Sequence, residues 1–248
     1  MISDDLGQLA IKALHFKDEG RDRSQQQIPG PSSAGSCARQ VYGSYRGWPT
    51  PNAGAVSKMA AIRGTAMHKA LEEALTDEAV LDRIRNECPS LAYLADGLAV
   101  EGTWPGIPGL LGDAHVDCYH EPSRTVCDWK NPTKTPTKAD WPGQQYEWQL
   151  SLYGYLLNAA GSPVENLVIV ALPMDKGESG VMTWEQPYSE ETAQTALAWL
   201  REQRERAEQA APPEPEKAWW FCKRFCPYYS PGFLCGGVRS FGDAGKEK

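Results

Sequence analysis

Four cysteines of this chain form two groups that lie far apart in sequence: one residue near the beginning and three near the end. Cys37 stands alone, whereas Cys222, Cys226 and Cys235 share the segment FCKRFCPYYSPGFLC. Four thiolates form the ligand set of a structural Zn²⁺ site or of a [4Fe–4S] cluster. A metal centre built from these four would hold both ends of the chain together, so it restricts the fold to one that closes on itself.

The size and composition are those of a globular protein. The chain has 248 residues, of which 41% are hydrophobic and 23% charged, enough to bury a full core. Because no apolar run approaches the ~20 residues that span a bilayer, we expect a cytoplasmic protein without a membrane partner. Its seven cysteines are then thiols or metal ligands, not disulfides. The net charge of −7 disfavours nucleic acid only if it is evenly spread, since local fields decide binding.

Hydrophobic periodicity predicts an α/β fold with the central order α-β-β-β-α-β. The predicted helices cover residues 4–18, 56–75, 77–95, 143–161 and 189–210. The predicted strands cover residues 98–104, 109–119, 125–132, 166–173 and 181–187. We expect one integrated domain made of an N-terminal part (1–55), a core (56–210) and a C-terminal part with the cysteine triplet (211–248).

Two carboxylates and a lysine are predicted to meet on one face of a hairpin. With the turn at HEPSR, centred near residue 122, Asp128 lies opposite residues 116–117, and Lys130 shares the face of Asp128. Asp117 and Asp128 are hard oxygen ligands that suit Mg²⁺ or Mn²⁺, and a lysine beside them can assist a water molecule. Asp113 lies on the same face and is the second choice for the first carboxylate. A solvated hairpin with surface charges would give the same short pattern.

Two predicted helices add side chains at one-turn spacing. His68 shares a helix face with Gly64 and Glu72, and its imidazole can bind a metal such as Mn²⁺. Gln149 and Tyr153 offer an amide and a phenol to a DNA phosphate or base. Taken alone, each position is better explained by a structural role, a satisfied histidine or a tyrosine packed in the core.

Together, the ordered set of GxxxH, Asp117, DWK and QxxxY resembles the RecB-type branch of the PD-(D/E)XK nucleases, whose core is restriction-endonuclease-like. The resemblance spans residues 30–240 and implies a mixed sheet flanked by helices. It implies that the metal is held by His68, Asp117, Asp128 and the main-chain carbonyl of Trp129. It further implies that Lys130 is the catalytic lysine and that Gln149 and Tyr153 contact the DNA strand.

The cysteines also resemble a family pattern, that of the iron–sulfur nucleases, which include the CRISPR-associated exonuclease family. In that family one cysteine precedes the nuclease core and three follow it, although the C-x3-C-x8-C spacing here is wider than is common. The resemblance implies a [4Fe–4S] cluster, with Zn²⁺ as the alternative, that joins the N- and C-terminal segments. We interpret Cys88, Cys118 and Cys127 as ordinary buried residues.

The function that we expect is a metal-dependent exonuclease that hydrolyses single-stranded or duplex DNA from its ends. Basic contacts are expected from Lys134 and from Lys138, Lys223 and Arg224. No GxxxxGK[ST] phosphate loop is present, so a helicase or recombination protein would be a separate partner, in recombination, repair or phage-like mobile-element processing. The alternatives are a non-catalytic adaptor that binds DNA ends and a sequence-specific endonuclease.

Overall fold

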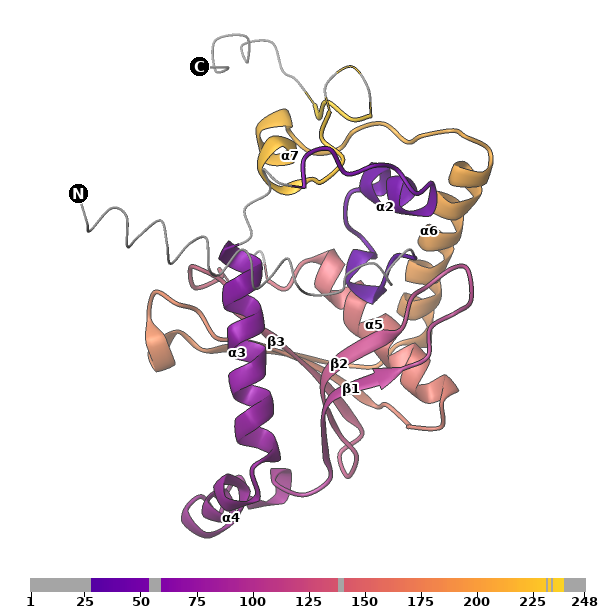
Figure 1. The fold of residues 1–248 in the computed structure, drawn as a ribbon. Coiled ribbons are helices and arrows are strands. Elements are labelled where there is room, and N and C mark those ends of the chain that lie inside the picture. Colours follow the sequence, from indigo (N-terminus) through magenta and orange to yellow (C-terminus); the bar gives the residue numbers. More distant parts are fainter. Residues whose placement is uncertain (1–27, 54–58, 138–140, 231, 233, 239–248) are drawn as a thin grey trace, which may run out of the picture.

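The computed structural model describes residues 28–53, 59–137, 141–230, 232 and 234–238 (Figure 1). The predicted helix over residues 4–18 lies outside this part. So do Lys138 and the first residues of the predicted helix that begins at residue 56.

A five-stranded mixed sheet forms the centre of the molecule, with the strands in the spatial order β1-β2-β3-β4-β5. The strands are β1 (Leu98–Trp104), β2 (Ala114–His120), β3 (Thr125–Lys130), β4 (Asn166–Ala171) and β5 (Met182–Pro187). Strands β3 and β4 are parallel, and all other neighbours are antiparallel. A parallel pair needs a long crossover, and the intervening helix provides it. The predicted α-β-β-β-α-β order and mixed sheet are confirmed.

Helix α5 (Gln144–Ala159) packs over one face of the sheet, and α6 (Glu190–Glu208) packs against α5. Leu150 and Leu157 of α5 and Leu200 of α6 are fully buried there. The start of α6 is fixed by Ser189, whose hydroxyl accepts a hydrogen bond from Thr192 N, because a side-chain acceptor satisfies an otherwise free amide in the first turn. Both helices end within two residues of the predicted positions.

The other face is covered in part by α3 (Met59–Thr76) and α4 (Glu78–Glu87), followed by a short 3-10 helix, η2 (Ala92–Leu94). The prediction of one helix over 77–95 was too long. Helix α4 ends at Glu87 because Pro89 follows, and the residue before a proline avoids the helical region. Cys88 has φ −126° and ψ 69° and is exposed, unlike Cys118 and Cys127.

The two ends of the described chain lie side by side (Figure 1). The N-terminal segment forms the 3-10 helix η1 (Pro31–Ser33) and α2 (Ala38–Tyr45), and the C-terminal segment forms α7 (Trp219–Phe225). Arg39 of α2 donates hydrogen bonds to Pro213 O at 2.7 Å and to Leu234 O at 2.8 Å. Asn52 Nδ2 donates to Cys226 O at 2.9 Å. These bonds hold the two segments together independently of any metal.

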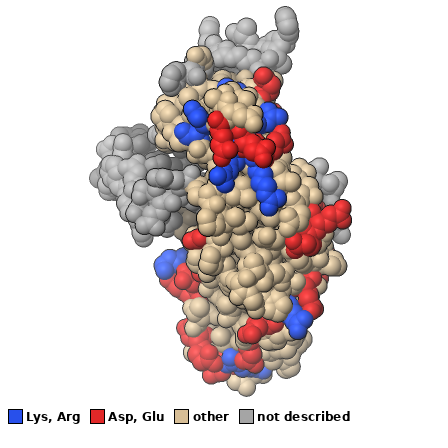
Figure 2. Space-filling view, turned by 90° about the vertical axis from the view of Figure 1, so that its right-hand side faces the viewer, with Lys and Arg blue, Asp and Glu red and all other residues tan. Residues whose placement is uncertain are grey.

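Acidic and basic side chains alternate on the face shown in Figure 2. On α6 they form pairs one turn apart, such as Arg204 Nε with Glu208 Oε1 at 3.0 Å and Arg206 Nη2 with Glu202 Oε1 at 2.8 Å. Mixed charge of this kind creates no extended positive field for a DNA backbone.

Among the described helices, none is both long and apolar enough to cross a membrane. A short 3-10 helix, η3 (Gly177–Gly180), precedes β5.

Candidate active site

Strands β2 and β3 bring two carboxylates together on the face that α5 covers. Their register pairs Cys118 with Cys127, and one further step along both strands places Asp117 opposite Asp128. The side chains are 6% and 1% exposed. The predicted cross-strand pairing is confirmed. Two acids buried side by side repel each other, which favours a bound cation between them.

Asp128 is held by a lysine and an amide. Lys130 Nζ lies 2.7 Å from Asp128 Oδ2, and Gln149 Nε2 donates to Asp128 Oδ1 at 3.0 Å. Lys130 Nζ also donates to Gln149 Oε1 at 3.3 Å. Burial raises the pKa of Asp128 to about 6, although Lys130 opposes the shift.

Gln149 and Tyr153 are placed differently from the expectation that they contact DNA. They are only 4% and 5% exposed, because this face of α5 packs onto the sheet. Gln149 Nε2 donates to Tyr153 Oη at 2.7 Å as well as to Asp128. Burial and the nearby Asp128 raise the pKa of Tyr153, so its phenol stays protonated. In this arrangement the two residues orient Asp128 and Lys130, and they do not reach an open surface.

His68 of α3 lies above the carboxylates. Its Nε2 is 3.0 Å from Trp129 O, and its Nδ1 is 3.4 Å from Asp117 Oδ1 and 3.6 Å from Glu101 Oε1. Both ring nitrogens face acceptors, which suits the doubly protonated ring. The hydrogen bond to Asp117 is the main reason that the pKa of His68 is raised. A divalent cation would take the place of the proton between these groups.

Glu101 of β1 belongs to this cluster, although the sequence did not indicate it. It interrupts the β1–β2 pairing between Val100 and Gly102 and has a φ of 51°, a strained conformation for a residue with a side chain. Burial and Asp117 raise the pKa of Glu101. In the described part of the chain, one set of three donor groups has its ligand atoms within 4.8 Å of one another: His68, Glu101 and Asp117. Asp128 lies beside this set, and its carboxylate faces Lys130.

The remaining predicted residues lie outside this cluster. Asp113, the second choice for the first carboxylate, is exposed and accepts a hydrogen bond from Gly106 N at 2.9 Å. It therefore supports a turn and does not join the cluster. Lys134, Lys223 and Arg224 are exposed and free to meet a phosphate backbone. Lys130 Nζ also lies 4.9 Å from the centre of the Tyr146 ring, a cation–π contact that steadies it.

The four predicted cysteine ligands line one small cavity where the chain ends meet: Cys37, Cys222, Cys226 and Cys235. All four are buried. Burial, strengthened by the neighbouring thiols, raises the pKa of Cys222 to about 12 and that of Cys226 to about 11, so metal binding here would release protons. No three of these sulfurs, all within the described residues, lie within 4.8 Å of one another. A Zn–S bond of about 2.3 Å would place each pair about 3.8 Å apart, so these thiols would have to move closer together to bind zinc.

Comparison with known proteins finds a family match over the later part of the chain. Residues 113–230, which include β2, β3, α5, β4, β5, α6 and α7, match the family model described as the PD-(D/E)XK nuclease superfamily. That segment is therefore similar to this nuclease superfamily. None of the curated proteins is significantly similar in sequence.

Several solved structures are distantly similar. One is an alkaline exonuclease from Laribacter hongkongensis, with 15% identity, a TM-score of 0.38 and coverage of 61% of this chain and 72% of that one. A phage-related exonuclease from Haemophilus somnus 129PT has 10% identity, a TM-score of 0.41 and coverage of 74% and 94%. A putative exonuclease from Eubacterium rectale has 13% identity, a TM-score of 0.35 and coverage of 69% and 65%. Likenesses this distant do not establish what this chain does.

Proposed function

We propose that this chain, whose residues 113–230 match the PD-(D/E)XK nuclease superfamily, is a metal-dependent deoxyribonuclease that hydrolyses DNA from its ends. The observation that carries the proposal is the convergence of Asp117, Asp128 and Lys130 beside His68. These groups come from α3, β2 and β3, and each has a separate part to play in phosphodiester hydrolysis.

The donor set fits a hard divalent cation. His68, Glu101 and Asp117 would hold it, with Asp128 and the carbonyl of Trp129 beside them. When bound, Mg²⁺ or Mn²⁺ supplies positive charge to the phosphate and lowers the pKa of a bound water. Asp117 Oδ2 already accepts a hydrogen bond from Trp129 N at 2.7 Å, so its other oxygen is directed toward His68.

Lys130 is placed to assist the attacking water. Its ammonium is held by Asp128 and by the side-chain oxygen of Gln149, so it has little freedom to turn away. From that position Lys130 can orient a water molecule and stabilise negative charge that develops on the phosphate. Gln149 keeps both partners fixed through two hydrogen bonds. We therefore assign Gln149 and Tyr153 a positioning role in place of the expected contact with DNA.

The proposal is tested with linear and closed circular DNA of the same sequence, in Mg²⁺ or Mn²⁺ and with EDTA. An exonuclease degrades linear DNA progressively and leaves closed circles intact. Cleavage of circles at defined sites would instead show a sequence-specific endonuclease. Binding of DNA ends without any hydrolysis, with either metal, would show an adaptor and would refute the enzyme.

Metal binding should become tighter as the pH rises from about 5.5 to 8. Asp128, with its pKa raised to about 6, and His68, whose pKa is also raised, both carry protons at the lower pH. A cation must displace these protons, so affinity grows as they dissociate. Titration calorimetry of Mn²⁺ in two buffers of different ionisation enthalpy will show proton release below pH 7. Equal affinity and no proton release across this range would contradict the site.

Glu101→Gln is expected to weaken Mn²⁺ binding by about tenfold, the loss typical when a supporting carboxylate is removed. The strained backbone at Glu101 holds its carboxylate toward His68 and Asp117, and glutamine keeps the shape without the charge. Glu121→Gln, an exposed change in the hairpin turn, serves as the control. Identical Mn²⁺ affinity in both variants would remove Glu101 from the metal site.

We also propose that the four clustered cysteines hold a [4Fe–4S] cluster with a structural role. The proposal is supported by the burial of all four thiols and by their position around one small cavity. Anaerobically purified protein should be brown and contain iron and acid-labile sulfide in roughly equal amounts. A colourless protein with stoichiometric zinc would overturn the cluster while keeping the metal link between the chain ends.

We also propose a biological setting for this activity. DNA ends would be the substrate in recombination, repair or phage-like mobile-element processing, in the cytoplasm. Exposed Lys134, Lys223 and Arg224 would contact the backbone. A separate helicase or recombination protein would deliver the ends.

A further inference from the structure

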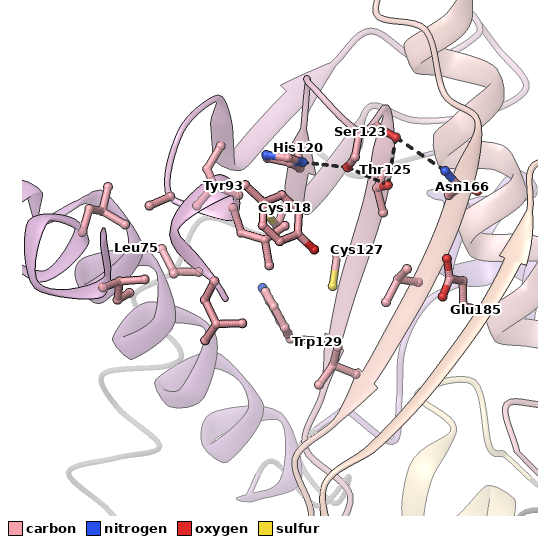
Figure 3. Close-up of a pocket in the computed structure, with 18 residues that line it drawn as sticks. Leu75, Tyr93, Cys118, His120, Ser123, Thr125, Cys127, Trp129, Asn166 and Glu185 are labelled. Atoms are coloured by element: carbon pink, nitrogen blue, oxygen red, sulfur yellow. Dashed lines mark hydrogen bonds between the residues drawn. The ribbon is translucent and has the colours of Figure 1, made fainter. Parts of the chain in front are cut away.

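A second cavity lies against the sheet (Figure 3). Its lining includes Cys118, Cys127 and Trp129, which alternate along β2 and β3 with Asp117 and Asp128 and therefore face the other side of the sheet. It has a volume of about 550 Å³, within the range of small-molecule sites. Its helical wall comes from α3, α4 and η2, and its other wall from all five strands of the sheet. Most of the lining is apolar, with Leu75, Leu94 and Leu98 on one side and Val168 and Val170 on the other.

Two polar groups at this cavity lack hydrogen-bond partners. His120 Nε2 and Trp129 Nε1 are buried and unpaired, and the ring of Trp129 is directed into the cavity in Figure 3. His120 is only 5% exposed. Because bulk water does not reach these atoms, their hydrogen-bonding capacity is left unmet unless something enters the cavity.

The hydrogen-bond chain around His120 identifies which role each atom can play. Ser123 Oγ donates to Thr125 Oγ1 at 2.9 Å, and Thr125 Oγ1 donates to Ser123 O at 3.1 Å. The Ser123 proton is thereby used, so His120 Nδ1, 2.6 Å from Ser123 Oγ, is the donor in that contact. In the neutral ring Nε2 is then an acceptor. The cavity thus offers one acceptor, His120 Nε2, and one donor, Trp129 Nε1–H.

The lining also excludes anions. None of its residues is a lysine or an arginine, and Glu185 contributes a carboxylate. A DNA strand, a nucleotide or a fatty acid would bring negative charge into an apolar space without a partner, which costs free energy. An uncharged molecule with an apolar body and a hydroxyl group meets both the walls and the unpaired atoms.

We propose that this cavity is a binding site for an uncharged, mainly apolar small molecule that carries a hydroxyl group. The hydroxyl donates to His120 Nε2 or accepts from Trp129 Nε1–H, and the body packs against the leucine and valine side chains. Trp129 connects this site to the opposite face, since its main chain donates to Asp117 and lies 3.0 Å from His68 Nε2. The proposal stands independently of the nuclease activity.

The test uses 2-naphthol as the probe and the full chain labelled with ¹⁵N in its tryptophan indoles. A Trp129→Phe spectrum identifies the Trp129 resonance among those of the nine tryptophans. Addition of 2-naphthol should shift that resonance with saturation and a Kd below about 1 mM. 2-Naphthoate, which has the same ring and a negative charge, should bind at least about tenfold more weakly.

Two variants locate the site. Val168→Phe fills the cavity with a residue that suits a strand and should weaken 2-naphthol binding at least about tenfold. Trp220→Gln changes an exposed aromatic residue on α7 and should leave binding unchanged. The proposal is overturned if the Trp129 resonance shows no saturable shift, if Val168→Phe binds 2-naphthol as wild type does, or if 2-naphthoate binds equally well. Circular dichroism confirms that both variants are folded.

Discussion

Asp128→Asn is expected to lower the rate of DNA hydrolysis by about 10²–10⁴-fold, the range for loss of a group that acts directly in proton transfer or charge stabilisation. Asparagine has nearly the shape of aspartate, so the β3 backbone and the packing of α5 should persist. What disappears is the negative charge that holds Lys130 Nζ at 2.7 Å. Without it, the Lys130 ammonium loses its anchor, and the neighbouring metal site loses a nearby negative charge.

Asp113→Asn is the matched control for this experiment. It also replaces an aspartate by an asparagine. Asp113 lies just before β2, is exposed and accepts a hydrogen bond from Gly106 N. Initial rates on end-labelled DNA in Mg²⁺ should differ between the two variants by at least about 10²-fold. If Asp128→Asn retains wild-type activity, or if Asp113→Asn is equally inactive, the assignment of the carboxylates is wrong.

Cys226→Ser is expected to remove the bound metal group and to destabilise the protein by about 3–5 kcal/mol, as the loss of a cross-link between distant segments does. For a chain of this size that lowers Tm by about 10 °C. Cys226 lies 7% exposed at the end of α7, in a cavity that it shares with Cys37 of the N-terminal segment. Its loss therefore removes one link between the two ends of the chain and leaves the hydrogen bonds of Arg39 and Asn52 to hold them.

Cys88→Ser is the control, because Cys88 is exposed and lies outside that cavity. Metal analysis, thermal unfolding and limited proteolysis of the anaerobically purified variants will compare the two. Cys226→Ser should lose metal and be cleaved more rapidly between residues 211 and 238. Equal metal content and equal Tm in the two variants would mean that the cysteines do not form a structural metal centre.

The sequence predicted the hairpin acids well because the turn between β2 and β3 is short. Only Glu121–Arg124 separate His120 from Thr125, so counting outward from the turn fixes the register. Glu101 could not be found in this way. The β1–β2 connection covers residues 105–113 and includes its own bridge between Ile107 and Leu111, which hides the register. The distorted φ of Glu101 then breaks the alternation that would have indicated its face.

The spacing of side chains also predicted some features of the helices correctly and others wrongly. Four-residue spacing correctly put Gln149 and Tyr153 on one face of α5, but spacing alone does not say which face meets the sheet. Their burial against β3 became evident only once the parallel β3–β4 pair positioned α5 over it. Helix α4 ends at Glu87 because Pro89 follows. The prediction extended the helix to residue 95 because it followed the helical periodicity of residues 77–95 and not this proline. Tertiary packing thus decided roles that local patterns left open.

The central claim is that His68, Glu101 and Asp117 form a divalent-metal site beside Asp128 and Lys130. Its most direct test is anomalous diffraction from crystals of the chain grown with Mn²⁺, recorded above and below the manganese absorption edge. We expect an anomalous peak in contact with His68, Glu101 and Asp117. Mn²⁺ bound only elsewhere, in crystals of protein that hydrolyses DNA with Mn²⁺, would contradict the claim.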